Sequence, residues 1–176
     1  MRVLMNKKLA KEILDRVRAD QRMRRQFIAG KMKWNKQIDR KNTQWLKKIT
    51  ERHGWPTISL VGSKASRGAW LLVQHADHDL RFQKKVLKIL NETHEKNKRD
   101  LNPENIAYLI DRVLVHEKKQ QVFGTQFRRK NEKAKFEPLP IKDRRNINKR
   151  RKAYGLPTIE ENTNRINEEY KRLYWK

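Results

Sequence analysis

The stretch that decides the fold lies at residues 69–90 and reads AWLLVQHADHDLRFQKKVLKIL. It is the longest strongly apolar segment of the chain, and two histidines and two aspartates stand in its middle. If the stretch is one helix, at about 100° per residue, its large apolar side chains share one face with His75, His78 and Asp79. Burying ionisable groups costs free energy unless they are paired, hydrogen-bonded or metal-bound. The pattern therefore indicates a polar site inside the protein.

Two structures are compatible with this stretch. The helix can run unbroken to about Asn97, or it can break at Asp79, whose side chain would then cap a second helix. Ser63 and Ser66 are the expected caps at the start of the first helix, because a serine side chain can accept a bond from a free backbone N–H.

The composition places the core in the middle of the chain. Lys and Arg total 45 against 20 Asp and Glu in 176 residues, a net charge of +25. Residues 1–50 hold 16 basic and 4 acidic residues, whereas residues 51–100 hold 10 and 6. A charge of this size attracts polyanions, so nucleic acid or another phosphate-rich partner is expected. The other interpretations are a basic protein with no specific anionic partner and a protein that binds an acidic protein.

Several classes of protein are excluded or disfavoured. The chain has no cysteine, which excludes disulfides, thiolate metal sites and thiol catalysis. No run approaches the roughly 18 apolar residues of a membrane span. Residues 1–5 are too short and too polar for a signal peptide, so a cytoplasmic protein is expected, although an effector exported by another route has the same features. Nothing in the sequence indicates the oligomeric state.

Apolar spacing and capping signals predict further helices. Gly54 should end one of them, because glycine readily adopts the left-handed conformation that follows many helices. Asn102 followed by Pro103 is a typical helix start, and Thr158 with Glu161 forms a capping box. The helices expected outside the central stretch cover residues 5–27, 35–53, 103–112, a short basic segment that begins at residue 143, and 159–174.

Beyond residue 112 the pattern changes to one typical of strands. Residues 113–115 and 121–123 favour β structure and flank a polar segment, which predicts a small β-hairpin through Phe127. An uninterrupted helix through Val115 is the alternative. The expected fold is mainly α, a compact multi-helix domain around the central apolar segment with one small β-hairpin. Its expected regions are a basic N-terminal helix (residues 1–34), the helical core with the hairpin (35–130) and a basic helical extension packed on the core (131–176).

Short motifs carry a resemblance to a known family. They are Gly54-Trp55-Pro56, Gln-His-Ala-Asp-His-Asp at residues 74–79, Asp-Arg-Val at 111–113 and Phe-Gly-Thr-Gln at 123–126, followed by Pro140-Ile141, Arg150-Arg151 and Gly155-Leu156-Pro157. In these motifs, across about residues 38–162, the chain resembles a bacterial family of unknown function. The resemblance implies a shared fold and pocket but no established activity. This chain departs from the family pattern in three places and in its high charge: Leu80 stands where proline is frequent, Asn148 where aspartate is frequent, and residues 113–121 lack a frequent glycine.

The histidines and aspartates of the central stretch also suggest a metal-binding or catalytic site. His75, His78 and Asp79 have the i, i+3, i+4 spacing of neighbours on a helix, and imidazole with carboxylate suits a divalent first-row metal. One helix supplies at most three ligands, so Asp111 or His53 would complete the site. An ion there could activate water for phosphoester hydrolysis, or, without an ion, His75 or His78 could act as a general base. The alternative is a structural hydrogen-bond network.

Two functions remain open, and the sequence does not decide whether the protein is an enzyme. One is a hydrolase for a phosphate-containing or nucleotide-like substrate, with His75, His78 and Asp79 as catalytic residues. Neutral donors and acceptors would bind its substrate, namely Gln74, Gln83, Gln121, Thr125 and Gln126. The other is a non-enzymatic nucleic-acid-binding protein, whose phosphate contacts would come from Arg144, Arg145, Lys149, Arg150, Arg151 and Lys152.

Overall fold

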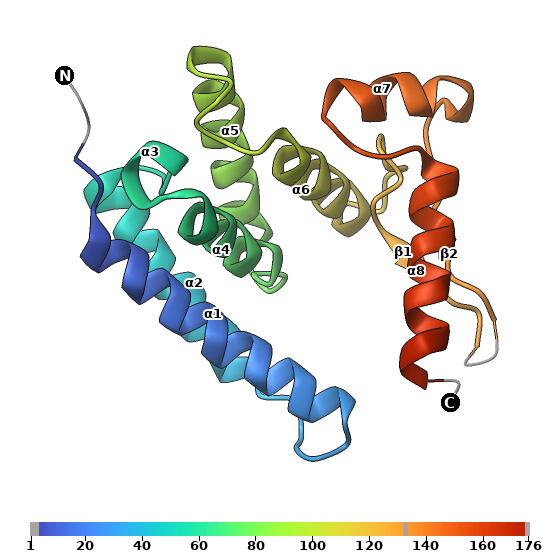
Figure 1. Ribbon diagram of the computed structural model, residues 1–176, viewed down its shortest axis with the longest axis horizontal. Helices are drawn as coiled ribbons and strands as arrows, with labels where there is room; N and C mark the ends of the chain where they lie inside the picture. The colour runs from blue at the N-terminus through green and yellow to red at the C-terminus, as the bar shows by residue number, and fades with distance from the viewer. Residues whose placement is uncertain (1–3, 132–133, 175–176) are drawn as a thin grey trace. The chain divides into compact units, whose positions relative to one another are not determined.

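The computed structural model describes residues 4–131 and 134–174, with side chains to residue 172. Residues 1–3 and 175–176 lie outside the described residues. Residues 1–3 are part of the expected N-terminal region and of the segment that is too short for a signal peptide. Residues 175–176 are part of the expected C-terminal extension. The described chain forms eight α-helices, one 3₁₀ helix and a two-stranded antiparallel sheet (Figure 1). The prediction of a mainly helical fold with one small β element is therefore confirmed.

The chain divides into two compact units, Met1–Asn105 and Ile106–Lys176. The helices of the first unit are α1 (Lys7–Ile28), α2 (Lys36–His53), α3 (Ile58–Val61), α4 (Ser63–Gln74) and α5 (Leu80–Lys96). Helix α6 (Pro103–His116) contains the boundary. The remaining elements belong to the second unit and are β1 (Phe127–Arg128), β2 (Glu137–Pro138), η1 (Arg144–Asn146), α7 (Ile147–Ala153) and α8 (Ile159–Tyr174).

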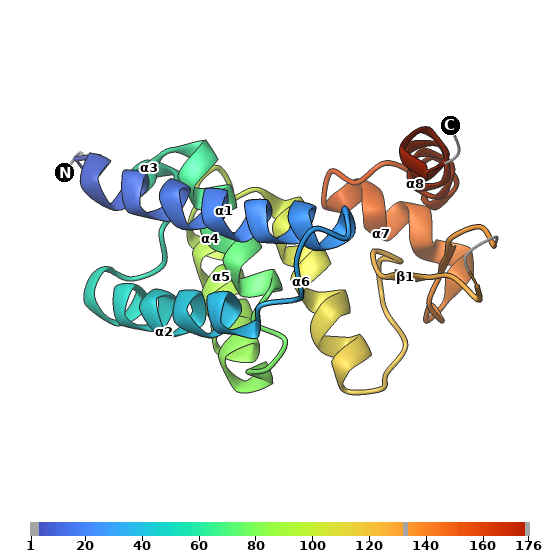
Figure 2. The same cartoon turned by 90° about the horizontal axis from the view of Figure 1, so that it is seen from below.

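Helices α1 and α2 form an antiparallel pair, and α4 packs against both (Figures 1 and 2). The α1–α4 contact depends on Gly68. A Cβ atom at this position would lie 3.0 Å from Cγ2 of Ile13 and 3.1 Å from Cγ2 of Val17. Interiors are packed as densely as organic crystals, so a larger residue would push the two helices apart. This close crossing brings the end of α4 next to the middle of α1.

The central stretch breaks at Asp79, which confirms the second of the two expected structures. Helix α4 ends at Gln74 and α5 begins at Leu80. The carboxylate of Asp79 accepts the backbone N–H of Phe82 at 3.0 Å, which caps α5. Leu80 is thus compatible with the break that a proline would favour. The buried Gln83 donates to the backbone oxygen of Val73 at 3.1 Å and ties the two helices together.

The start of α4 differs from the prediction. Its N-cap is Gly62, at a φ of 80°, and no side chain caps the helix. Ser63 lies inside the first turn and Ser66 is buried within the helix, so the expected serine caps are wrong. Elsewhere the expected helix ends are confirmed: Gly54 follows α2 at a φ of 73°, and Thr158 and Glu161 exchange bonds of 2.8 and 3.2 Å before α8.

The hairpin expected at residues 113–127 is wrong, and the alternative helix is confirmed. Helix α6 continues to His116 because Ile106, Leu109 and Val113 keep helical spacing and are all buried. Burial of an amphipathic face outweighs the weak β preference of valine. The small sheet forms later in the chain, where Phe127 pairs with Pro138 and Arg128 with Glu137.

Asp111 organises the second unit. Its fully buried carboxylate accepts the backbone N–H groups of Val122, Phe123 and Thr125 at 2.7, 3.0 and 2.9 Å, and the Thr125 hydroxyl at 3.0 Å. Burial raises the pKa of Asp111 although these four donors oppose the shift. The carboxylate thereby fixes the loop at residues 121–126, whose backbone groups would otherwise lack partners.

No helix within residues 4–131 and 134–174 combines the length and the apolar character needed to cross a membrane.

Candidate functional site

The candidate site is built around a contact between Asp20 of α1 and His75, the residue that follows α4. Nδ1 of His75 lies 3.1 Å from Oδ1 and 3.0 Å from Oδ2 of Asp20. The Asp20 side chain is fully buried, and that of His75 is 15% exposed. Because an ionised carboxylate only accepts hydrogen bonds, Nδ1 carries the proton. In its neutral form, the ring would therefore keep its lone pair on Nε2.

Arg24 joins this pair to a second carboxylate. Its Nε lies 3.1 Å from Oδ1 of Asp20, and its Nη2 donates to Asp39 at 2.7 Å. Asp39 is nearly buried in the first turn of α2, where the helix dipole favours a negative charge. The guanidinium also lies over the ring of Trp34, 4.7 Å from its centroid. One arginine thus neutralises part of the charge of two carboxylates from different helices.

The two carboxylates have different proton affinities. Burial opposes ionisation of Asp20, but the hydrogen bond and the electrostatic attraction of His75, the hydrogen bond from Gln21 and the charge of Arg24 outweigh it and hold the pKa of Asp20 below its ordinary value. Burial raises the pKa of Asp39, since Arg24 compensates only in part and the charge of Asp20 adds to the shift. Paired groups whose pKa values are pushed apart are typical of acid–base sites.

A cavity of about 280 Å³ opens beside this network. Its lining combines cations, carboxylates, two histidines and an aromatic ring: Arg24, Trp34, Lys36, Asp39, Arg40, His75, Asp77 and His78. Volumes near 300 Å³ are at the lower end of the approximate range for small-molecule sites. The arrangement can therefore bind a small ligand next to His75.

Asp20, Asp39 and His75 can also hold a metal ion. One ligand atom of each lies within 4.8 Å of the others, and among the described residues this is the group of His, Asp and Glu side chains with that property. Mixed N and O ligands suit divalent ions, but to ligate through Nδ1 the ring of His75 would first have to give up the proton that it donates to Asp20. Arg24 now lies between the carboxylates, so its guanidinium and an ion would compete for the same oxygens.

The break between α4 and α5 separates the residues that were expected to act together as metal ligands or catalytic residues. His75 belongs to the group above, but His78 is exposed and the expectation that it points inward is wrong. Asp79 accepts from Lys47 as well as from Phe82. Burial opposes its ionisation, but these two donors outweigh it and hold the pKa of Asp79 below its ordinary value. Asp111, in the second unit, instead holds its own loop.

Except for Gln74, the expected substrate-binding residues form side-chain hydrogen bonds inside the protein. Gln74 is buried at the end of α4, where its Nε2 has no partner among the described residues, and Gln83 bonds Val73 and Asp77. In the second unit Gln121 bonds backbone atoms of Gln126 and Leu139, Thr125 bonds Asp111, and Gln126 contacts Arg112. These contacts stabilise the loop that the Phe-Gly-Thr-Gln motif forms.

Of the six basic residues at positions 144–152 that were expected to contact phosphate, only some have side chains that an external ligand can reach. Arg151 is fully buried, and its guanidinium donates to the backbone oxygens of Phe123 and Pro157. Arg150 donates to Val122, Lys142 and Asp143. Exposed basic side chains of the run are Arg144, Arg145, Lys149 and Lys152.

Sequence reasoning missed Asp20, Arg24 and Asp39. A signal existed for Asp20, because it lies in phase with Leu9, Ile13 and Met23 on the buried face of α1. A carboxylate at such a position requires a buried partner. Arg24 and Asp39 offered no comparable signal, since each stands among other charged residues of its helix.

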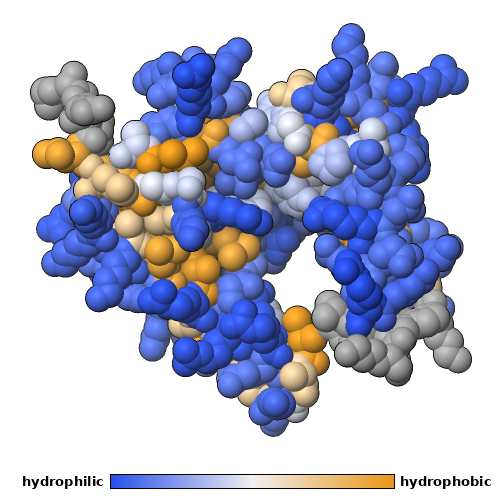
Figure 3. All heavy atoms as spheres, viewed as in Figure 1, coloured by the Kyte–Doolittle hydropathy of each residue, from blue (hydrophilic) through white to orange (hydrophobic). Residues whose placement is uncertain are grey.

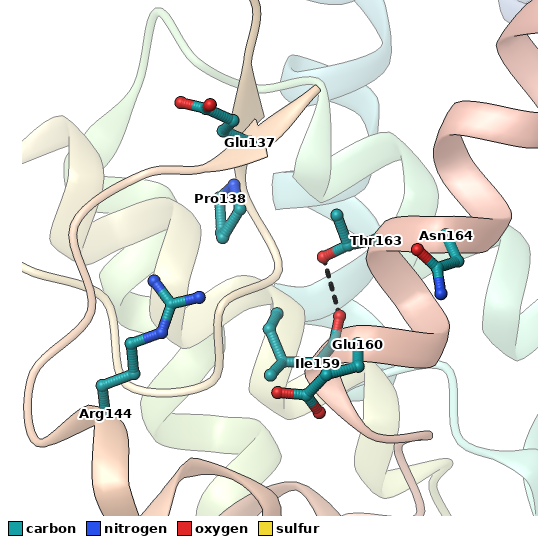
Figure 4. Close-up of a pocket in the computed structure, with 7 residues that line it drawn as sticks. All are labelled: Glu137, Pro138, Arg144, Ile159, Glu160, Thr163 and Asn164. Carbon is teal, nitrogen blue, oxygen red and sulfur yellow. Dashed lines mark hydrogen bonds between the residues drawn. The ribbon is translucent and has the colours of Figure 1, made fainter. Parts of the chain in front are cut away.

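A second, larger cavity of about 610 Å³ lies in the second unit between β2, η1 and α8. Figure 4 shows Arg144 on one side and Glu160 on the other, with the Thr163 hydroxyl turned to the backbone oxygen of Ile159. Glu137, Arg144 and Glu160 are all exposed. The ionisable groups of this second cavity are therefore well hydrated, whereas Asp20 and His75 are buried or nearly so. The second cavity is the weaker candidate for catalysis.

The comparisons with known proteins agree with the resemblance noted in the sequence. A family model described as a family of unknown function (DUF6624) matches residues 7–174. No curated protein and no solved structure matches the chain. Because the family model takes in nearly the whole chain and both compact units, the protein belongs to this family of unknown function, DUF6624.

Proposed function

We propose that the cavity beside His75 is the active site of a hydrolase for a small phosphate-containing substrate, with His75 as general base. The observation that carries the proposal is the bond from Nδ1 of His75 to the buried carboxylate of Asp20. A carboxylate in this position sets the tautomer of the ring and stabilises the cation that forms when Nε2 takes a proton.

The cavity lining supports a phosphate-containing ligand. Lys36 and Arg40 are exposed cations on its wall and can bind phosphate oxygens. Trp34 adds apolar surface to the same wall. Arg24 has a different role, because both carboxylates already engage its guanidinium.

The proposed step is attack of water on phosphorus. Nε2 of His75 takes a proton from water while the water oxygen forms a bond to phosphorus and the bond to the leaving oxygen breaks. The proton then passes to the leaving oxygen, directly or through His78, which lines the same cavity. Asp79 acts as a positioning residue, because it caps α5 and so holds the turn that carries both histidines.

A metal-assisted form of the same reaction is supported by the Asp20, Asp39 and His75 group. In this form an ion would lower the pKa of the attacking water, and Lys36 and Arg40 would keep their role. Removal of metal separates the two forms, since only the second one loses turnover when a chelator is present.

The test is hydrolysis of chromogenic phosphate monoesters and diesters by the purified full chain, with EDTA and with added Mn²⁺ or Zn²⁺. His75→Asn should lower kcat by about 10²–10⁴-fold, the usual contribution of a general base. The matched control is His116→Gln, an exposed histidine of the second unit, which should keep full turnover. Equal turnover of the His75→Asn variant and the unmodified protein would remove the proposal.

Non-enzymatic binding of nucleic acid is the second candidate. The net charge of +25 and four exposed basic residues of η1 and α7 favour it. Replacing Arg144 and Arg145 with Gln should lower affinity for any oligonucleotide and reduce the salt slope by about 2, because each phosphate contact contributes about one unit. If instead His75→Asn lowers the affinity, this second candidate fails.

A further inference from the structure

The turn between α1 and α2 exposes large apolar side chains. Phe27 is 44% exposed, Ile28 60% and Trp34 37%. Figure 3 shows hydrophobic spheres at this end of α1, with hydrophilic spheres around them. Single exposed apolar residues are ordinary, but a group of them bordered by charged residues is typical of an interaction surface. We call residues 22–36 the hairpin tip.

The tip carries positive charge only. No Asp or Glu occurs between Asp20 and Asp39, and both of these carboxylates are bound to Arg24. The exposed cations around the apolar group are Arg22, Arg25, Lys31, Lys33 and Lys36.

Backbone hydrogen bonds and a contact between two rings connect the residues of the tip. Gly30 has a φ of 67°, and the backbone N–H groups of Gly30 and Lys31 donate to Phe27 and Gln26 at 2.9 Å. The rings of Phe27 and Trp34 meet edge to face with centroids 5.2 Å apart. Phe27 and Trp34 therefore already contact each other without a partner, and contacts formed before binding lower its entropy cost.

We propose that the hairpin tip binds the surface of a lipid bilayer that contains anionic phospholipid. Phe27 and Ile28 would enter the boundary between head groups and acyl chains, and Trp34 would lie at the head-group level, where indole rings are enriched. The surrounding lysines and arginines would contact the anionic head groups.

Two other occupants fit less well. Nucleic acid needs free aromatic faces for stacking, but Arg24 lies over the Trp34 ring, and Ile28, the most exposed large apolar residue of the tip, has no π face. A second copy of the chain would bring two purely cationic tips together, and like charges at an interface oppose association.

Sedimentation with vesicles tests the proposal, using the full chain and phosphatidylcholine vesicles with or without phosphatidylglycerol. A protein of net charge +25 binds anionic vesicles to some extent by charge alone. Replacement of the two apolar residues, Phe27 and Ile28, is therefore the decisive comparison. The double variant Phe27→Ser, Ile28→Ser should bind anionic vesicles at least about tenfold more weakly at equal net charge. Neutral vesicles should bind little of either protein.

Charge variants provide the matched comparison. Lys31→Gln with Lys33→Gln should lower affinity by about fivefold per charge, whereas Lys84→Gln with Lys88→Gln, exposed lysines of α5, should have little effect. These variants leave Trp34 and Lys36 of the cavity unchanged, so the result does not depend on the proposed hydrolase activity. Circular dichroism checks that each variant folds.

Three outcomes would overturn the proposal. The first is equal binding of anionic vesicles by the serine variant and the unmodified protein, with both folded. The second is a greater loss of oligonucleotide binding than of vesicle binding in the serine variant, which would identify a nucleic-acid surface. The third is a dimer in sedimentation velocity that the serine variant loses, which would identify an interface between copies.

Discussion

Asp20 and His75 are 55 residues apart in the chain, yet Nδ1 of His75 lies within 3.1 Å of both carboxylate oxygens of Asp20. Three helices produce this contact. Asp20 comes from α1, the imidazole follows α4, and Arg24 connects them to Asp39 of α2. The site therefore exists only when these helices are packed together, and its chemistry can be tested through stability as well as through turnover.

The first prediction concerns Asp20 and pH. Because the folded-state pKa of Asp20 lies below the ordinary value of about 3.9, its ionised form stabilises the fold above that pH, and this contribution disappears as pH falls through the folded pKa. Asp20→Asn should cost about 3 kcal/mol at neutral pH, since Arg24 and His75 lose a buried partner. The difference from the unmodified protein should shrink below about pH 4. Urea unfolding followed by tryptophan fluorescence across this range measures it.

The pH dependence of stability expected from Asp39 is opposite to that expected from Asp20. Its folded-state pKa is raised, so the folded protein binds a proton there more readily than the unfolded chain and gains stability as pH falls through that pKa. Asp39→Asn, which resembles the protonated acid, should cost less than Asp20→Asn at neutral pH. Identical pH profiles for the two variants would contradict the assignment of opposite shifts.

The second prediction concerns competition between Arg24 and a metal ion. Arg24→Met removes the guanidinium from Asp20 and Asp39 and keeps much of the side-chain volume. The variant should melt at a lower temperature, and Mn²⁺ or Zn²⁺ should restore part of the loss if Asp20, Asp39 and His75 then hold the ion. Thermal unfolding with and without each ion is the measurement. The double variant Arg24→Met, His75→Asn is the control and should show no recovery.

The third prediction separates two roles of Asp79. Its carboxylate caps α5 through Phe82 and also pairs with Lys47. Asp79→Ser keeps a capping oxygen and should cost a few tenths of a kcal/mol, whereas Asp79→Ala should cost about 1 kcal/mol, the usual effect of losing a cap. Chemical denaturation gives both values. Equal losses for Ser and Ala would show that the ion pair, rather than the cap, determines the effect.

The fourth prediction concerns Gly124 in the loop that Asp111 holds. Gly124 has a φ of 69°, and a Cβ atom there would lie 2.8 Å from Cδ1 of Ile159 and 3.0 Å from Cδ1 of Ile141. Gly124→Ala should therefore cost about 2–4 kcal/mol, from both backbone strain and overpacking. Hydrogen exchange at the amides of Val122 and Phe123 should become faster as the loop loosens.

Gly30→Ala is the control for this effect. Gly30 has nearly the same φ of 67°, but nothing lies within 4 Å of its would-be Cβ. It should cost only the backbone term of about 1–2 kcal/mol. A loss at Gly30 as large as that at Gly124 would show that packing against Ile159 contributes nothing.

The central stretch shows why sequence reasoning succeeded locally and failed at longer range. The capping ability of Asp79 and the inward position of Phe82 and Val86 follow from short-range rules, and the structure confirms them. The hairpin expected after residue 112 failed because β-branched residues suit either a strand or a buried helix face. Only burial in the folded protein selects the helix that carries Val113.

In the candidate site, too, sequence reasoning succeeded for local features and failed for contacts between distant residues. The histidine–aspartate stretch marked His75 as a residue that needs a partner, but no local rule could name Asp20, because that partner lies on another helix. The close crossing of α1 and α4 at Gly68 places the two side chains together. Asp111 is the reverse case, since an expected metal ligand proved to be the acceptor for backbone N–H groups of its own unit.

The sequence by itself determined that the protein is mainly helical, strongly basic and free of cysteine chemistry, and it left open whether the central stretch is one helix or breaks at Asp79. These properties depend on composition, on apolar periodicity and on interactions within a few residues. Only the tertiary structure decided which carboxylates surround His75 and which basic residues stay exposed. The physical reason is that burial and charge pairing depend on which helix faces meet, and residues far apart in the chain determine that together.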